Sequence, residues 1–220
     1  MVSNKEQRSA LYDRMARDLD QHGPLFSNMA TLLRRLLNLY SIRTLIKNSS
    51  LYHFSMFHAS HHISPVPATQ DEIEAEAAAV RAVTQELCPL KIVLDRVVLT
   101  STGVLLGCWQ VISGSDPITI RAKLRTALPR APEKQLYDAA ILHTSFARLL
   151  GHPKASSMML SNTGDQVHFF HGLVDRLNNE LRGFEAVVSE LWYVEEFDVL
   201  ALALNGRMKM RRFQLGCSRN

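Results

Sequence analysis

Apolar residues recur three or four positions apart over several stretches of the chain, a spacing typical of helices with one buried face. In the first such stretch, Leu11, Met15 and Leu19 are four residues apart, and Gly23-Pro24 follow where a helix would end. The strongest pattern opens with Asp71-Glu72 and continues through an alanine-rich middle. Helices are accordingly predicted over residues 5–21, 27–47, 70–87, 116–128 and 165–181.

Shorter apolar runs, rich in β-branched and aromatic residues, alternate with these helices and predict strands. The predicted strands cover residues 51–57, 91–99, 104–112, 139–150, 184–194, 199–204 and 207–215. Two pairs of strands are separated by turn residues, Ser101-Thr102-Gly103 and Asn205-Gly206, so each pair predicts a β-hairpin. Mixed helices and antiparallel strands predict the α+β class.

The composition is that of a globular protein. Of the 220 residues, 46% are hydrophobic and 21% are charged. The net charge of +4 is compatible with anionic ligands but does not require them. Arg34, Arg35 and Arg43 interrupt the longest apolar stretch, so no transmembrane segment is predicted, and the first residues lack the apolar core of a secretory signal.

The three cysteines, Cys88, Cys108 and Cys217, are far apart in the sequence and form no CxxC pair. An odd number at such spacing argues against a disulfide framework and against a zinc site. The expectation is free thiols that are buried as small apolar residues. We therefore expect a reducing, intracellular location, cytoplasmic or organellar.

Two of the predicted strands carry the same polar pattern, a histidine followed two residues later by a serine. The first motif contains His53 and Ser55, and the second contains His143 and Ser145. Because residues i and i+2 of a strand point to the same side, each motif presents one imidazole and one hydroxyl on one surface. Two imidazoles can act as acid and base at neutral pH, while hydroxyls stabilise charge on a phosphate.

The paired motifs resemble the signature of the two-histidine (2H) phosphoesterase superfamily, His-x-(Thr or Ser)-x repeated twice. The late segment 191–195, Leu-Trp-Tyr-Val-Glu, is also similar to a strand of that family, and the resemblance covers about residues 49–215. It implies a bilobed, pseudo-two-fold duplicated fold of antiparallel sheets with flanking helices. It also implies metal-independent cleavage of 2′,3′-cyclic phosphates or RNA-end phosphodiesters, without a cofactor. His53 and His143 would then be acid and base, and Ser55 and Ser145 would hold the phosphate.

Three further residues near the motifs are candidates for contacts with the substrate. Arg148 follows the second motif and is a possible phosphate contact, and Tyr52 and Trp109 are possible stacking partners of a base. A surface cation for Arg148 and core packing for the two aromatic residues are the alternatives.

The loop after the first motif offers an alternative histidine-x-serine triplet, His58-Ala-Ser60. We prefer His53 because it lies within the apolar alternation, whereas residues 58–62 are too polar for a central strand. The histidines of this loop lack a third or fourth fixed donor beside them, so no metal site is predicted.

The sequence predicts a helical extension over residues 1–48 and a phosphoesterase-like domain over residues 49–220. The basic helix over 27–47 is a candidate for docking to another protein. An alternative to an enzyme is a nucleotide- or RNA-binding module of the same fold without turnover, possibly a subunit of a larger assembly. An unrelated α+β structural protein requires that the strand assignments are wrong.

Overall fold

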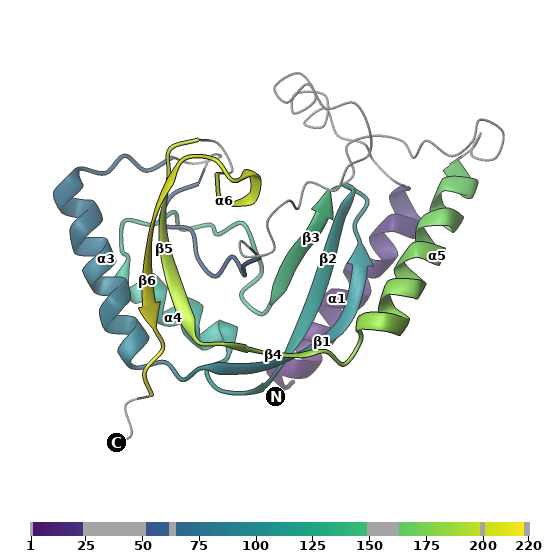
Figure 1. Cartoon of the computed structure of the whole chain (residues 1–220), viewed down its shortest axis with the longest axis horizontal. Coiled ribbons are helices and arrows are strands. Elements are labelled where there is room, and N and C mark those ends of the chain that lie inside the picture. The colour runs from purple at the N-terminus through teal and green to yellow at the C-terminus, as the bar shows by residue number, and fades with distance from the viewer. Residues whose placement is uncertain (1, 24–51, 62–64, 149–162, 199–200, 218–220) are drawn as a thin grey trace. The chain divides into compact units, whose positions relative to one another are not determined.

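The computed structural model describes residues 2–23, 52–61, 65–148, 163–198 and 201–217 (Figure 1). Its elements in chain order are α1 (Asn4–His22), α3 (Gln70–Gln85), β1 (Leu90–Leu99), β2 (Val104–Ser113), α4 (Pro117–Ala127), β3 (His143–Arg148), α5 (Thr163–Leu181), β4 (Glu185–Val188), β5 (Glu190–Glu196), α6 (Ala201–Leu204) and β6 (Met208–Gln214). The α+β class is therefore confirmed. The helix predicted over 27–47 lies outside the described residues.

The strands form two sheets. One has the order β3-β2-β1-β4, with β2–β3 and β1–β4 paired antiparallel. The other is the antiparallel pair β5–β6. Among the helices that the structure describes, none has the length and apolar character needed to cross a membrane.

The chain divides into two compact units. The first unit contains α1, residues 52–53, residues 94–109, β3 and α5. The second unit contains residues 54–93 and 110–142 together with β4, β5, α6 and β6. The predicted boundary at residue 48 and the predicted two-fold duplication both stay predictions.

In the first unit, helices α1 and α5 pack together on strand residues. Helix α1 begins at Ser3, whose hydroxyl accepts from Glu6 N while the Glu6 side chain accepts from Ser3 N, a capping box. Leu19 of α1, Leu99 of β1 and Phe170 of α5 form a buried cluster. Burial of these three side chains supplies several kcal/mol of hydrophobic stabilisation, at about 1.5–3 kcal/mol each.

In the second unit, both long helices begin at caps that the sequence encodes. Thr69 and Glu72 form a capping box at α3, and the Asp116 carboxylate accepts from Ile118 N at α4 with Pro117 in the first turn. These caps satisfy backbone donors that have no partner within the helix. The helices predicted over 70–87 and 116–128 are confirmed within a few residues.

The prediction of a strand over 199–204 is wrong for the residues that the structure describes, because residues 201–204 form helix α6. Asn205 has a φ of 56°, the left-handed conformation that often ends a helix. The amide of Gly206 then donates to Ala201 O at 2.8 Å, the bond of a Schellman motif. Asn-Gly thus ends a helix here, whereas the sequence analysis interpreted the same pair as a hairpin turn.

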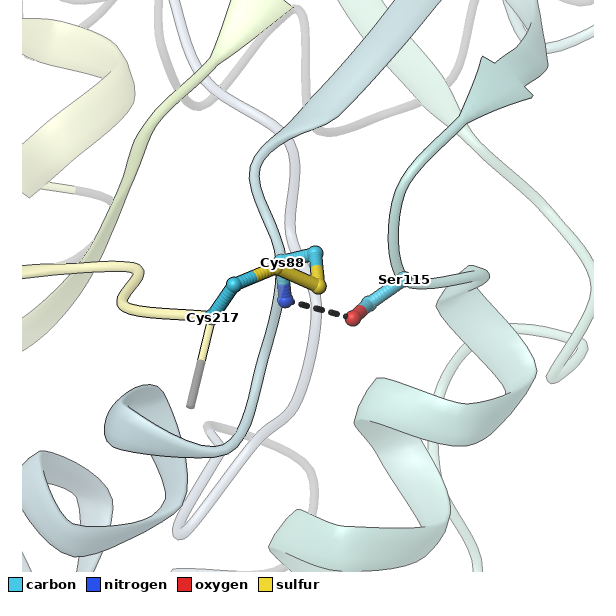
Figure 2. Close-up of a disulfide and its surroundings, with 3 residues drawn as sticks. All are labelled: Cys88, Ser115 and Cys217. Carbon is cyan, nitrogen blue, oxygen red and sulfur yellow. Dashed lines mark hydrogen bonds between the residues drawn. A yellow bond between two sulfur atoms is a disulfide. The ribbon is translucent and has the colours of Figure 1, made fainter. Parts of the chain in front are cut away.

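The prediction that all three cysteines are free is also wrong. Cys88 and Cys217 form a disulfide that links the segment after α3 to the segment after β6 (Figure 2). They are separated by 129 residues, so only the tertiary fold reveals the pairing. Cys108 is free and buried, and desolvation raises the pKa of its thiol to about 12.

Candidate active site

The second motif lies on a strand with a defined register. In β3, His143 is paired with Cys108 and Ser145 with Leu106 of β2. Because Cys108 and Leu106 are two residues apart, their cross-strand partners His143 and Ser145 share one face of the sheet. The observed strand begins later than the strand predicted over 139–150, because β3 starts at His143. Residues 149–150 lie outside the residues that the structure describes.

A β-bulge follows the serine of the second motif. The register shifts between Leu105, which is paired with Ala147, and Leu106, so Phe146 is the extra residue of β3. The ring of Phe146 covers Gly107 of β2, where an added Cβ would lie 2.3 Å from the ring. Glycine at this position therefore makes room for the Phe146 ring.

The two polar residues of the second motif differ in exposure. His143 is 7% exposed, whereas Ser145 is exposed. A buried imidazole next to an exposed hydroxyl on one face is compatible with a site in which the histidine is held rigidly and the serine meets a ligand.

The first motif is not on a strand, and the strand predicted over 51–57 is wrong for residues 52–57. These residues form neither helix nor strand. The guanidinium group of Arg121 donates through Nη2 to Ser55 O at 3.2 Å and through Nε to Met56 O at 2.8 Å. Arginine therefore satisfies carbonyls that a neighbouring strand would have satisfied, which is the physical reason for the difference.

Arg121 also joins the first motif to the residues that precede the second. Its Nη1 donates to Ala139 O at 2.6 Å, four residues before His143. The side chain comes from α4 and is only 8% exposed. One buried cation thus binds Ser55 and Met56 on one side and Ala139 on the other, all within the second unit.

In the first unit, the start of the first motif lies against β3. The rings of Tyr52 and Phe146 have centroids 6.0 Å apart and meet edge to face at 72°. Tyr52 precedes His53, and Phe146 follows Ser145. This contact brings the start of the first motif beside β3 within the first unit.

The predicted site residues are distributed over both units. His53, His143 and Ser145 belong to the first unit, and Ser55 belongs to the second. His53 and Ser55 are half-buried. The structure therefore places the two histidines in the same unit, where Tyr52 brings the segment of one beside the strand of the other.

The other candidates occupy different surroundings in the first unit. Arg148 is half-buried at the end of β3, in register with Val104. Tyr52 is 44% exposed beside the first motif, whereas Trp109 is only 6% exposed and meets the ring of Phe184 edge to face at 6.3 Å. The exposed Tyr52 is thus better placed than Trp109 to stack on a ligand.

The alternative triplet lies in a loop held by a glutamine. His58 N donates to the Gln135 side-chain oxygen at 2.8 Å, and Gln135 Nε2 donates to His58 O at 3.0 Å. The His58 ring lies 5.9 Å from that of His61 and 5.6 Å from that of Tyr137. His62 lies outside the description, and among the described residues no three His, Cys, Asp or Glu side chains are grouped to hold a metal ion.

Sequence reasoning missed Arg121, although a signal was present. Arg121 follows Ile120 and precedes Leu124 by three residues, so it falls on the apolar face of the predicted helix over 116–128. A cation on a buried face needs partners, and backbone carbonyls are such partners. The identity of those carbonyls depends on the tertiary fold.

Comparison with known proteins identifies no match to a protein-family model, to a curated protein or to a solved structure. The resemblance to the 2H phosphoesterase superfamily therefore depends on the two motifs and their order along the chain.

Proposed function

We propose that this protein is a metal-independent phosphodiesterase that hydrolyses or transfers a 2′,3′-cyclic phosphate or an RNA-end phosphodiester. The observation that carries the proposal is the Tyr52–Phe146 contact within the first unit, which brings the residue before His53 beside the strand that carries His143. Two copies of one polar pattern, 90 residues apart in the sequence, thus supply two imidazoles to the same unit, which supports a two-histidine site. The substrates favour an intracellular location, cytoplasmic or organellar.

The proposed reaction uses the two imidazoles in opposite roles. One of His53 and His143 takes the proton from the attacking water as the new bond to phosphorus forms. The other donates a proton to the ribose oxygen whose bond to phosphorus breaks. The hydroxyls of Ser55 and Ser145 donate to non-bridging oxygens, where negative charge increases in the transition state. The direction of the substrate decides which histidine is the base.

The proposal is tested with a panel of 2′,3′-cyclic mononucleotides in the presence of EDTA. We expect turnover by the wild-type protein and a loss in kcat of about 10²-fold or more in His53→Ala and in His143→Ala, the size typical of a lost acid or base. The control is His168→Ala, since His168 is an exposed residue of α5 and its removal should leave kcat unchanged. Circular dichroism verifies that each variant is folded.

A further variant, His58→Ala, distinguishes the two possible first motifs. The proposal expects His58→Ala to retain wild-type kcat. Loss of activity in His58→Ala together with full activity in His53→Ala would move the acid/base role to the loop. Nucleotide binding without turnover, unchanged in both motif variants, would instead support the non-catalytic binding module.

A further inference from the structure

The Cys88–Cys217 disulfide of the second unit has two unequal ends (Figure 2). Cys217 is an exposed residue, whereas Cys88 is half-buried. The main chain of Cys88 is also fixed, because its amide donates to Ser115 Oγ at 2.8 Å and its carbonyl accepts from Ser115 N at 3.3 Å. Exposed disulfides exchange with thiols more readily than enclosed ones. The Cys217 sulfur is therefore the end that is more open to a thiol in solution.

The segment that carries Cys217 lies against the end of helix α3 and is held there by backbone bonds. Leu215 N donates to Ser189 O at 2.8 Å, and the Leu215 side chain is buried. Gly216 N donates to Thr84 O at 3.0 Å. Thr84 belongs to the last turn of α3, where carbonyl oxygens lack their full set of helical partners. The disulfide adds the covalent link that keeps the Gly216 amide at this carbonyl.

The other end of the disulfide is packed against the turn that leads into α4. Gly114, in this turn, has a φ of 96°, and an added Cβ there would collide with Pro89 O. Ser115 bonds to both main-chain groups of Cys88, and the next residue, Asp116, caps α4. Because the turn rests on Cys88 and Pro89, a displacement of Cys88 disturbs the turn as well.

We infer that Cys88–Cys217 is a thiol–disulfide exchange site, which a low-molecular-weight thiol such as glutathione opens at the Cys217 sulfur. Opening releases the segment after β6 from the end of α3 and loosens the turn before α4. The inference does not rest on the proposed phosphodiesterase activity, since it uses none of the motif residues and is tested without a substrate.

The exchange is balanced by two molecules of the small thiol. The thiolate of the first attacks the Cys217 sulfur, so a mixed disulfide forms, the bond to Cys88 breaks, and Cys88 leaves as a thiolate that takes up a proton. A second thiol attacks the mixed disulfide at the sulfur of the first. This step leaves Cys217 as a thiol and gives the oxidised dimer of the small thiol. Two electrons thus pass to the protein disulfide, and the oxidised dimer closes the bond again by the reverse steps.

The test labels the thiols of the native, oxidised protein after incubation with reduced glutathione. Cys108 is the internal control, because it is free and buried and becomes reactive only if the fold opens. We expect iodoacetamide to label Cys88 and Cys217 and to leave Cys108 unlabelled. After a brief incubation we expect glutathione attached to Cys217 alone. Peptide mass spectrometry measures both results.

Three outcomes of this labelling overturn the inference. If Cys88 and Cys217 stay unlabelled, the disulfide does not exchange in the native protein. If all three cysteines are labelled together, the disulfide opens only when the protein unfolds. If glutathione is attached to Cys88 in place of Cys217, the thiol attacks the other sulfur.

Hydrogen–deuterium exchange tests the release of the segment. In reduced wild-type protein we expect the amides of Gly216 and Ser115 to exchange about tenfold faster or more than in the oxidised protein, because both bonds are lost by local opening. Cys217→Ser is the matched variant and should show this faster exchange with and without glutathione. Helix α1, in the first unit, is the control and should be unchanged. Equal exchange at Gly216 and Ser115 in oxidised and reduced wild-type protein would overturn the release.

Discussion

The two histidine motifs have the same sequence pattern but are held by different means. The second, His143 to Ser145, lies on β3, where backbone bonds to β2 fix the register. The first, His53 to Ser55, lies on neither helix nor strand and is fixed by the side chain of Arg121. Similar local sequences are therefore supported by a strand ladder in one case and by a buried cation in the other.

The difference teaches that an apolar alternation alone does not determine a strand. A strand also needs a neighbouring backbone to accept and donate its ladder bonds. At residues 55–56 the donor is Arg121. Its guanidinium group donates hydrogen bonds to the carbonyl oxygens of Ser55, Met56 and Ala139. The side chain of Arg121 thus supports residues 55–56 of the first motif, whereas backbone bonds to β2 support the second motif.

The largest expected effect comes from removing that side chain. Arg121→Ala should lower the free energy of unfolding by about 3 kcal/mol, because the Met56 carbonyl is left as a buried acceptor without its donor, at about 1–3 kcal/mol, and the part-buried bonds to Ser55 and Ala139 are lost as well. Hydrogen–deuterium exchange should rise over residues 53–58 and remain low over residues 143–148. Chemical denaturation and exchange mass spectrometry measure the two quantities.

Two companion measurements make the Arg121→Ala result specific. Arg121→Lys keeps the charge but loses the planar guanidinium group with its several donors, so we expect an intermediate loss of stability.

The Cys108 thiol reports on the second motif, because Cys108 is the cross-strand partner of His143. Burial raises the pKa of this thiol to about 12, so the native thiol should resist alkylation at pH 8. Rapid alkylation of Cys108 in Arg121→Ala would contradict the independence of the two motifs.

A smaller effect is expected when the second motif is disturbed. In Gly107→Ala the new methyl group meets the Phe146 ring, which must move away from its place over β2. Overpacking of this kind typically costs about 1–3 kcal/mol. Thermal unfolding measures the loss, and faster alkylation of Cys108 should accompany it.

Exchange over residues 53–58 decides whether Gly107→Ala acts on the second motif alone. We expect no change at residues 55–56, since Arg121 still holds them. A rise there as large as in Arg121→Ala would show that the strand supports both motifs.

The sequence predicted the parts of the fold that depend on local signals. Helix α3 was expected from the acidic pair Asp71-Glu72 at its start and from its alanine-rich middle, and the turn at 101–103 predicted the pairing of β1 with β2. The predicted strand over 184–194 is present as β4 and β5, which Ser189 separates. Ser189 O accepts from Leu215 N, a tertiary bond that no local pattern indicates.

The missed features all depend on partners distant in the sequence. Arg121 replaces a strand partner for residues 55–56, and Cys217 finds Cys88 across 129 residues. The pair Asn205-Gly206 suits both a hairpin turn and a helix end, and the residues before it decide between them. For the candidate site, the sequence named the histidines and serines, but the support of the first motif came only from the structure.

The smallest expected effect concerns the contact that joins the two motifs in the first unit. In a double-mutant cycle with Tyr52→Leu and Phe146→Leu, we expect a coupling free energy of about 0.5–1 kcal/mol, because an edge-to-face ring pair contributes beyond the area it buries. Tyr52 is 44% exposed, which keeps the value at the low end. Urea unfolding of the four proteins measures it. A coupling of zero would mean that this ring pair does not stabilise the position of the first motif beside β3.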